Sequence, residues 1–187
     1  STEGDLTMDS LLVGDISLIK TELQEYDIAS LPISIRPASQ VIGMDEAPAT
    51  ALRKKKDSSI GVTLEMIKRR EALAAVSAGS TGAALAASIL ILKTLRGIDR
   101  PAIGTVIPTV NGGNTLLLDV GANVDCKPHH LLQFGVMGHA YAKHVLDKPH
   151  PSIGLLSIGE EAIKGNGLTK EAFQLFKKSS MNFIGNT

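Results

Sequence analysis

Three glycine-containing loops carry the polar side chains of this sequence that could bind and transform a ligand. The first loop, residues 77–82 (Ser-Ala-Gly-Ser-Thr-Gly), runs directly into a predicted helix. Small residues let the backbone approach an anion closely, and free N–H groups at a helix start favour negative charge. The alternative is a tight turn in which Ser or Thr caps the helix. The predicted anion site consists of Ser77, Gly79, Ser80, Thr81 and Gly82.

The second loop, residues 119–125 (Asp-Val-Gly-Ala-Asn-Val-Asp), follows a predicted buried strand. Ligands of open α/β sheets bind beyond the carboxyl ends of strands, so this cluster predicts a site that includes Asp119, Gly121, Asn123 and Asp125. Each residue also has a structural alternative. Asp119 could satisfy buried backbone donors, and Asp125 could cap the helix that begins near Pro128.

The third loop, residues 158–166 (Ile-Gly-Glu-Glu-Ala-Ile-Lys-Gly-Asn), places one cation between small and polar residues. Lys164 is a candidate to neutralise a phosphate or an oxyanion that develops during a reaction, with Gly165 and Asn166 beside it. The alternative is a solvated loop whose Lys and Glu side chains pair weakly.

Other chemistries lack their sequence signatures. The five histidines show no metal-ligand spacing, so no metal site is predicted. Cys126, the single cysteine, excludes an internal disulfide, and it has no His–Asn or His–Asp companion motif typical of a catalytic thiol. Walker-type, Gly-x-Ser-x-Gly and Gly-x-Gly-x-x-Gly motifs are absent from the sequence, which therefore predicts no cofactor.

Composition favours a globular, cytoplasmic protein that does not bind nucleic acid. Nineteen basic residues balance nineteen acidic ones, and aromatic residues make up 3%. Residues 1–5 contain neither a basic segment nor an apolar run, so no signal peptide is predicted there. The longest apolar stretch, residues 82–92, is too short to span a bilayer.

Predicted strands and helices alternate along the chain and must position these loops, and this alternation predicts an α/β layered fold. We expect one domain, residues 1–187, that is incomplete at both ends. The turn at residues 110–114 predicts a hairpin, so part of the sheet is antiparallel. Predicted strands lie at residues 10–13, 32–36, 74–77, 102–107, 115–120, 152–157 and 182–184. Predicted helices lie at residues 16–23, 48–55, 60–72, 82–95, 128–146 and 169–178.

Six sequence blocks, in order, make the chain resemble the acyl-ACP:phosphate acyltransferase family (PlsX) from about Leu12 to Asn186. This resemblance has two departures: the family's opening Asp-Ala-Met-Gly-Gly-Asp loop has no counterpart, and family members usually carry Asn at the position of Ser80. The family also continues beyond Thr187. The blocks are residues 41–46, 53–59, 77–79, 97–102, 116–125 and 164–166.

The resemblance implies a homodimeric, three-layer α/β/α enzyme with a mostly parallel sheet, related in fold to isocitrate and isopropylmalate dehydrogenases. It also implies transfer of a fatty acyl group from acyl carrier protein (ACP) to inorganic phosphate, in the cytoplasm and peripherally at the membrane. Phosphate can attack a thioester directly, so the loops at 77–82 and 119–125 would form its pocket, Lys164 would neutralise charge and Asn123 would orient a reacting group. The acidic carrier could dock on residues 53–56. Alternatives are a phosphotransacetylase-like enzyme acting on acyl-CoA and a catalytically silent ACP-binding module.

Overall fold

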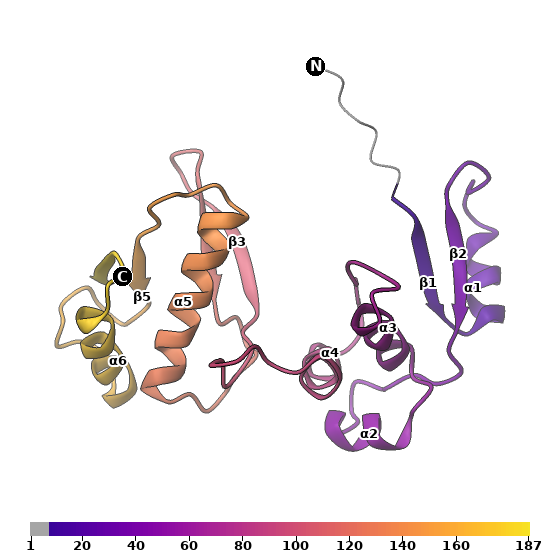
Figure 1. Cartoon of the computed structure of the whole chain (residues 1–187), viewed down its shortest axis with the longest axis horizontal. Coiled ribbons are helices and arrows are strands. Elements are labelled where there is room, and N and C mark those ends of the chain that lie inside the picture. The colour runs from indigo at the N-terminus through magenta and orange to yellow at the C-terminus, as the bar shows by residue number, and fades with distance from the viewer. Residues whose placement is uncertain (1–7) are drawn as a thin grey trace. The chain divides into compact units, whose positions relative to one another are not determined.

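The computed structural model describes residues 8–187, which form two compact units that divide after Lys93 (Figure 1). The N-terminal residues examined for a signal peptide lie outside the described residues. The single-domain organisation expected for residues 1–187 stays a prediction.

The first unit begins with a parallel strand pair joined through a helix. Strand β1 (Ser10–Gly14) pairs with β2 (Ile33–Pro37), and α1 (Ile16–Leu23) connects them. The Asp15 carboxylate caps α1 by accepting the N–H groups of Ser17 and Leu18 at 2.8 and 3.1 Å. This βαβ arrangement confirms the strands and the helix predicted at these positions.

Three short helices complete the first unit: α2 (Pro48–Lys54), α3 (Ser59–Lys68) and α4 (Thr81–Ala87). A π-helical turn, η1 (Ser88–Leu92), continues α4 and ends where Lys93 adopts a φ of 71°. The buried residues Ile42, Ala51 and Ala83 form the small core of these helices. Small side chains therefore let the α2 and α4 helices pack closely together.

The predicted strand at residues 74–77 is wrong. This segment pairs with no strand of residues 8–187, and Leu73 and Val76 are 99% and 98% exposed. The apolar run indicated a buried strand, but a strand needs a hydrogen-bonding neighbour, and none of the described segments supplies one. Helix α3 also stops four residues before its predicted end, because Arg70 takes a φ of 62°.

The second unit opens with the predicted hairpin. Strands β3 (Gly104–Pro108) and β4 (Asn114–Leu118) are antiparallel, with Gly104 opposite Leu118 and Pro108 opposite Asn114. Gly112 takes a φ of 77° in the turn, a conformation that glycine adopts without steric cost. The hairpin prediction is confirmed.

Helix α5 (Pro128–His144) lies between this hairpin and the remaining elements, β5 (Ile153–Leu155), α6 (Gly167–Lys178) and β6 (Phe183–Asn186) (Figure 1). Two glycines of α5 allow this close packing. A Cβ at Gly138 would lie 2.9 Å from Leu118 Cδ1, and one at Gly135 would lie 2.4 Å from Phe176 Cε1.

The parallel pair β5–β6 covers a core formed by Leu155, Ala172 and Phe176. The Phe176 ring stacks on Phe183 with 5.0 Å between centroids. Parallel strands and packed helices in both units confirm the α/β class, with the strands of residues 8–187 arranged as three two-stranded sheets.

None of the helices formed by residues 8–187 is long and apolar enough to cross a bilayer.

Candidate functional site

A cavity of about 260 Å³ in the first unit brings part of the 77–82 loop together with α3. Ser77, Gly79 and Ser80, three residues of the predicted anion site, line it, whereas Thr81 and Gly82 form the first turn of α4 and are not among its lining residues. The whole lining is uncharged and consists of Val13, Val41, Ile42, Ser59, Ile60, Thr63, Val76, Ser77, Ala78, Gly79, Ser80 and Ala83.

The hydroxyl groups of the loop already accept backbone hydrogen bonds. Ser80 Oγ caps α4 by accepting the Ala83 N–H at 3.3 Å, and Ser77 Oγ accepts the Gly79 N–H at 3.4 Å. Ser80 therefore has the capping role given above as the alternative. Both hydroxyls use only acceptor capacity in these bonds, so each keeps its hydrogen to donate to a ligand.

Sequence reasoning missed the contribution of α3 to this cavity. Ser59 and Thr63 line it, and the 53–59 block, which ends at the first residue of α3, was the signal that could have indicated them. The Asp57 carboxylate holds this segment by accepting the Ser39 N–H and O–H at 2.7 and 2.6 Å, and these hydrogen bonds lower the pKa of Asp57.

One residue of the basic segment 53–56 pairs with other groups of the fold. Lys55 Nζ lies 2.5 Å from Glu46 Oε1 and donates to the Val41 carbonyl oxygen at 2.7 Å. Lys55, together with the Gly43 N–H, lowers the pKa of Glu46. Arg53, Lys54 and Lys56 are exposed, so the charge of this segment that remains available to a partner comes from those three.

In the second unit, Asp119 organises its loop. Its Oδ1 accepts the N–H groups of Ile103 and Ala122 at 3.0 and 3.3 Å, and its Oδ2 accepts the N–H and the side-chain Nδ2 of Asn123 at 2.8 and 2.9 Å. Four hydrogen bonds to one carboxylate hold the loop against the segment that leads into β3. Asp119 therefore has the structural role that the sequence left open.

Asn123 is anchored by the same arrangement. Its Nδ2 also donates to the Pro101 carbonyl oxygen at 2.9 Å, so both amide hydrogens are used. Its Oδ1 accepts no hydrogen bond within residues 8–187, so it keeps its capacity to accept one. Gly121, with a φ of 79°, permits the turn between Asp119 and Asn123.

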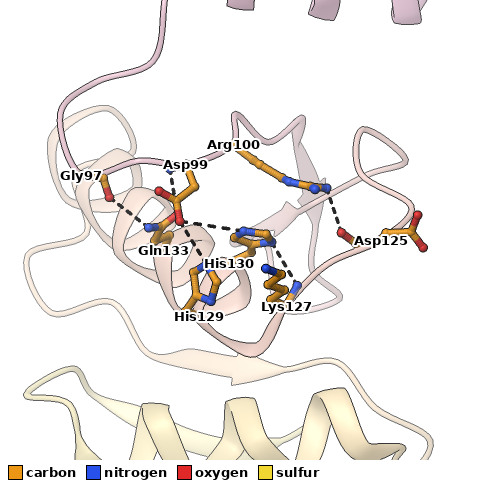
Figure 2. Close-up of polar contacts among 8 residues, drawn as sticks. All are labelled: Gly97, Asp99, Arg100, Asp125, Lys127, His129, His130 and Gln133. Atoms are coloured by element: carbon orange, nitrogen blue, oxygen red, sulfur yellow. Dashed lines mark hydrogen bonds and ion pairs between the residues drawn. The ribbon is translucent and has the colours of Figure 1, made fainter.

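The suggested capping role of Asp125 is wrong. Lys127 is the N-cap of α5, and its N–H donates to Nδ1 of His130 at 3.0 Å. Asp125 is held instead through its backbone, because its carbonyl oxygen accepts from Arg100 Nη1 at 2.8 Å (Figure 2). The Asp125 carboxylate makes no hydrogen bond within residues 8–187.

Figure 2 shows a polar network at the start of α5 that the sequence did not predict. His129 Nε2 lies 3.0 Å from Asp99 Oδ2, Gln133 Oε1 accepts the Asp99 N–H at 3.1 Å, and Gln133 Nε2 donates to the Gly97 carbonyl oxygen at 3.0 Å. Thirty or more positions separate these partners, so only the 97–102 block could have hinted at them. The network fixes the segment before β3 onto α5.

Asp99, His129 and His130 each place one potential ligand atom within 4.8 Å of the others. His130 is 4% exposed, and burial lowers its pKa, so its neutral form is favoured. Because Nδ1 of His130 accepts the Lys127 N–H, the proton of the neutral ring sits on Nε2, the atom that faces Asp99. A metal at Nε2 would have to displace that proton, so this tautomer opposes metal binding by the three residues.

Lys164 is exposed, and its ammonium group forms no ion pair within the described part of the chain. The aliphatic part of its side chain crosses Gly159, where a Cβ would lie 3.2 Å from Lys164 Cγ. Its neighbours have structural roles: Gly165 takes a φ of 99°, and Asn166 Oδ1 caps α6 by accepting the Thr169 N–H at 3.0 Å.

Comparison with known proteins gives a consistent result. Residues 1–187 match the family described as "Fatty acid synthesis protein". Proteins named phosphate acyltransferase from Geotalea uraniireducens and Desulforamulus reducens are 50% and 51% identical over 182 residues, 97% of this chain and 52% and 54% of those proteins. The phosphate acyltransferase of Geobacter sulfurreducens is 51% identical over 174 residues, 93% of this chain and 50% of that protein. The chain thus spans about half the length of these relatives.

Proposed function

The chain belongs to the fatty acid synthesis protein family, and on this basis we propose that it takes part in the transfer of a fatty acyl group from acyl-ACP to inorganic phosphate. The product would be an acyl phosphate for phospholipid synthesis. The names of the relatives support acyl transfer to phosphate. The resemblance described above supports ACP as the carrier of the acyl group.

The observation that carries the proposal is that residues 8–187 place no activated protein nucleophile beside the candidate sites. Ser77 and Ser80 contact backbone N–H groups and, among residues 8–187, no side-chain base. Burial, and secondarily the charge of Asp119, raise the pKa of the Cys126 thiol, which disfavours the reactive thiolate. These features suit a reaction in which the phosphate itself is the nucleophile.

In that reaction a phosphate oxygen attacks the thioester carbonyl carbon, the C–S bond breaks, and the ACP thiolate leaves and takes up a proton. The protein must hold the phosphate in line and stabilise the oxyanion. Lys164 is the proposed cation for the developing charge, because its ammonium forms no ion pair within the described residues. Asn123 is proposed to orient a reacting group through its free Oδ1, and Gly121, Asp125, Gly165 and Asn166 to shape the loops beside them.

The finer architecture and the partners are part of the same proposal. A three-layer α/β/α fold with a mostly parallel sheet, a homodimer and peripheral association with the inner face of the membrane follow from the resemblance. The exposed side chains of Arg53, Lys54 and Lys56 support docking of acidic ACP, because opposite charges steer association.

The proposal is tested by following the release of ACP thiol from palmitoyl-ACP by this 187-residue chain, with and without inorganic phosphate. The phosphate acyltransferase of Geobacter sulfurreducens serves as the positive control. Phosphate-dependent release is the expected result, and palmitoyl-CoA should be a poorer donor. Preference for acyl-CoA would support the phosphotransacetylase-like alternative. ACP binding without release, while the control enzyme is active, would contradict catalysis by this chain.

A further inference from the structure

The side-chain amide of Asn123 has one allowed orientation. Asp119 Oδ2 and the Pro101 carbonyl oxygen both lie 2.9 Å from the same end of this amide. Both oxygens are acceptors, and an amide oxygen placed between them would have no hydrogen to share with either. The end that faces them is therefore the NH₂ group, which donates both of its hydrogens. The carbonyl oxygen, Oδ1, is the opposite end of the amide.

The Oδ1 atom is open to a ligand. Asn123 is half-buried, and its Oδ1 is not one of the buried unpaired side-chain atoms of residues 8–187, so solvent reaches it. An amide oxygen only accepts hydrogen bonds. Asn123 can thus receive an O–H or N–H group of a ligand, but it cannot stabilise an oxyanion, which is itself an acceptor.

Asp119 holds the backbone of Asn123 as well as its side chain. The same Oδ2 accepts the Asn123 N–H at 2.8 Å, while the other carboxylate oxygen accepts the N–H groups of Ile103 and Ala122 at 3.0 and 3.3 Å. One carboxylate thus fixes both the place of Asn123 and the direction of its amide. A side chain that is held in this way is preorganised, so little motion has to be lost when it contacts a reactant.

We propose that Asp119 is a positioning residue of the reaction, which acts by presenting the amide oxygen of Asn123 to an O–H or N–H group of a reactant. The hydroxyl of protonated phosphate and an N–H group of the acyl carrier are the two sources of such a donor. The thioester carbonyl is excluded, because it only accepts hydrogen bonds. The role in the reaction rests on the proposed function, whereas the orientation of the amide does not.

The orientation is tested without activity, by hydrogen exchange of side-chain amides in NMR spectra of the 187-residue chain. Both Nδ2 hydrogens of Asn123 donate, so they should exchange at least about tenfold more slowly than those of Asn111, an exposed residue whose side chain forms no hydrogen bond within residues 8–187. Asp119→Asn should accelerate this exchange, and Asp147→Asn, the same change at an exposed residue of the same unit, should not. Equal exchange of the two amides in the unmodified chain would overturn the proposal.

The role in the reaction is tested by a double-mutant cycle on the phosphate-dependent release of thiol from palmitoyl-ACP, with circular dichroism verifying that each variant is folded. Asn123→Ala should lower kcat about 100-fold and Asp119→Asn about tenfold. If Asp119 acts through Asn123, the double variant should lose no more than Asn123→Ala alone. Independent effects would multiply to about 1000-fold, which would overturn the positioning role and leave the function standing.

Separate titrations of the two reactants identify the donor. A raised KM of Asn123→Ala for phosphate would support the phosphate hydroxyl, and a raised KM for palmitoyl-ACP would support an N–H group of the carrier. An unchanged kcat with both KM values unchanged would refute the proposal. Failure of the proposed function is recognised separately: if the unmodified chain releases no thiol while its Asn123 amide is protected, the orientation stands and the function is contradicted.

Discussion

Asp119→Asn tests whether one carboxylate holds the 119–125 loop. The carboxylate accepts four hydrogen bonds, two at each oxygen. An amide keeps one oxygen and turns an NH₂ group toward the other two donors, whichever way it is oriented. Two hydrogen bonds to a charged acceptor are lost, each worth about 1.5–3 kcal/mol, so we expect the free energy of unfolding to fall by about 3–6 kcal/mol. A typical domain has about 5–15 kcal/mol in total.

The assay is urea unfolding, combined with amide hydrogen exchange at Ile103 and Asn123, whose N–H groups donate to the carboxylate. Exchange at both amides should accelerate in Asp119→Asn. Asp125→Asn is the matched control in the same loop, because its carboxylate makes no hydrogen bond within residues 8–187, and its effect should stay within about 0.5 kcal/mol. A loss below about 1 kcal/mol in Asp119→Asn, with unchanged exchange at both amides, would refute this account of the loop.

Three further predictions concern other parts of the second unit. Gly135→Val should lower the free energy of unfolding by about 1–3 kcal/mol in urea titrations, because a Cβ at this position would lie 2.4 Å from the Phe176 ring. Gly167→Ala is the control and should not lower it, because the Cβ position of Gly167 lies in open space. Equal stability of the two variants would contradict the packing argument. Burial lowers the pKa of His130 below its ordinary value of 6.5. The stability that the neutral His130 ring contributes to the fold is therefore fully present above about pH 6.5 and is lost as the pH falls toward the lower pKa of the folded state. Between about pH 7.5 and 5 the melting temperature should fall less in His130→Gln than in the unmodified chain, and identical profiles of the two proteins would contradict this. Lys164→Ala should reduce the phosphate-dependent release of thiol about 10²–10³-fold, whereas Lys164→Arg, which keeps the positive charge, should retain part of this activity. Near-normal turnover of the alanine variant would remove Lys164 from the proposed mechanism.

The candidate site was only partly predictable. The 77–82 loop contains four residues that line the cavity, and its short side chains and its place before a helix were readable in the sequence. Ser59 was not singled out, because its role depends on the start of α3 lying opposite a loop about 20 positions further along the chain. The roles of Asp99, His129 and Gln133 likewise depend on contacts across 30 or more positions.

The sequence by itself determined the features that depend on neighbouring residues. The start of α1 after Asp15, the start of α5 at Pro128 and the turn between β3 and β4 follow from capping, proline geometry and glycine turn chemistry, which act within a few positions. Six ordered blocks likewise indicate the family.

Only the tertiary structure decided which polar groups form hydrogen bonds with one another. Asp119 could have been a ligand or a structural acceptor, and the approach of the Ile103 N–H, 16 positions away, revealed the structural role. Residues 74–77 have the apolar character of a buried strand but lack a partner among the described residues. The physical reason is the same in both cases: a side chain or strand acquires its role from the donor or acceptor that folding brings to it, and local sequence does not specify which distant group that will be.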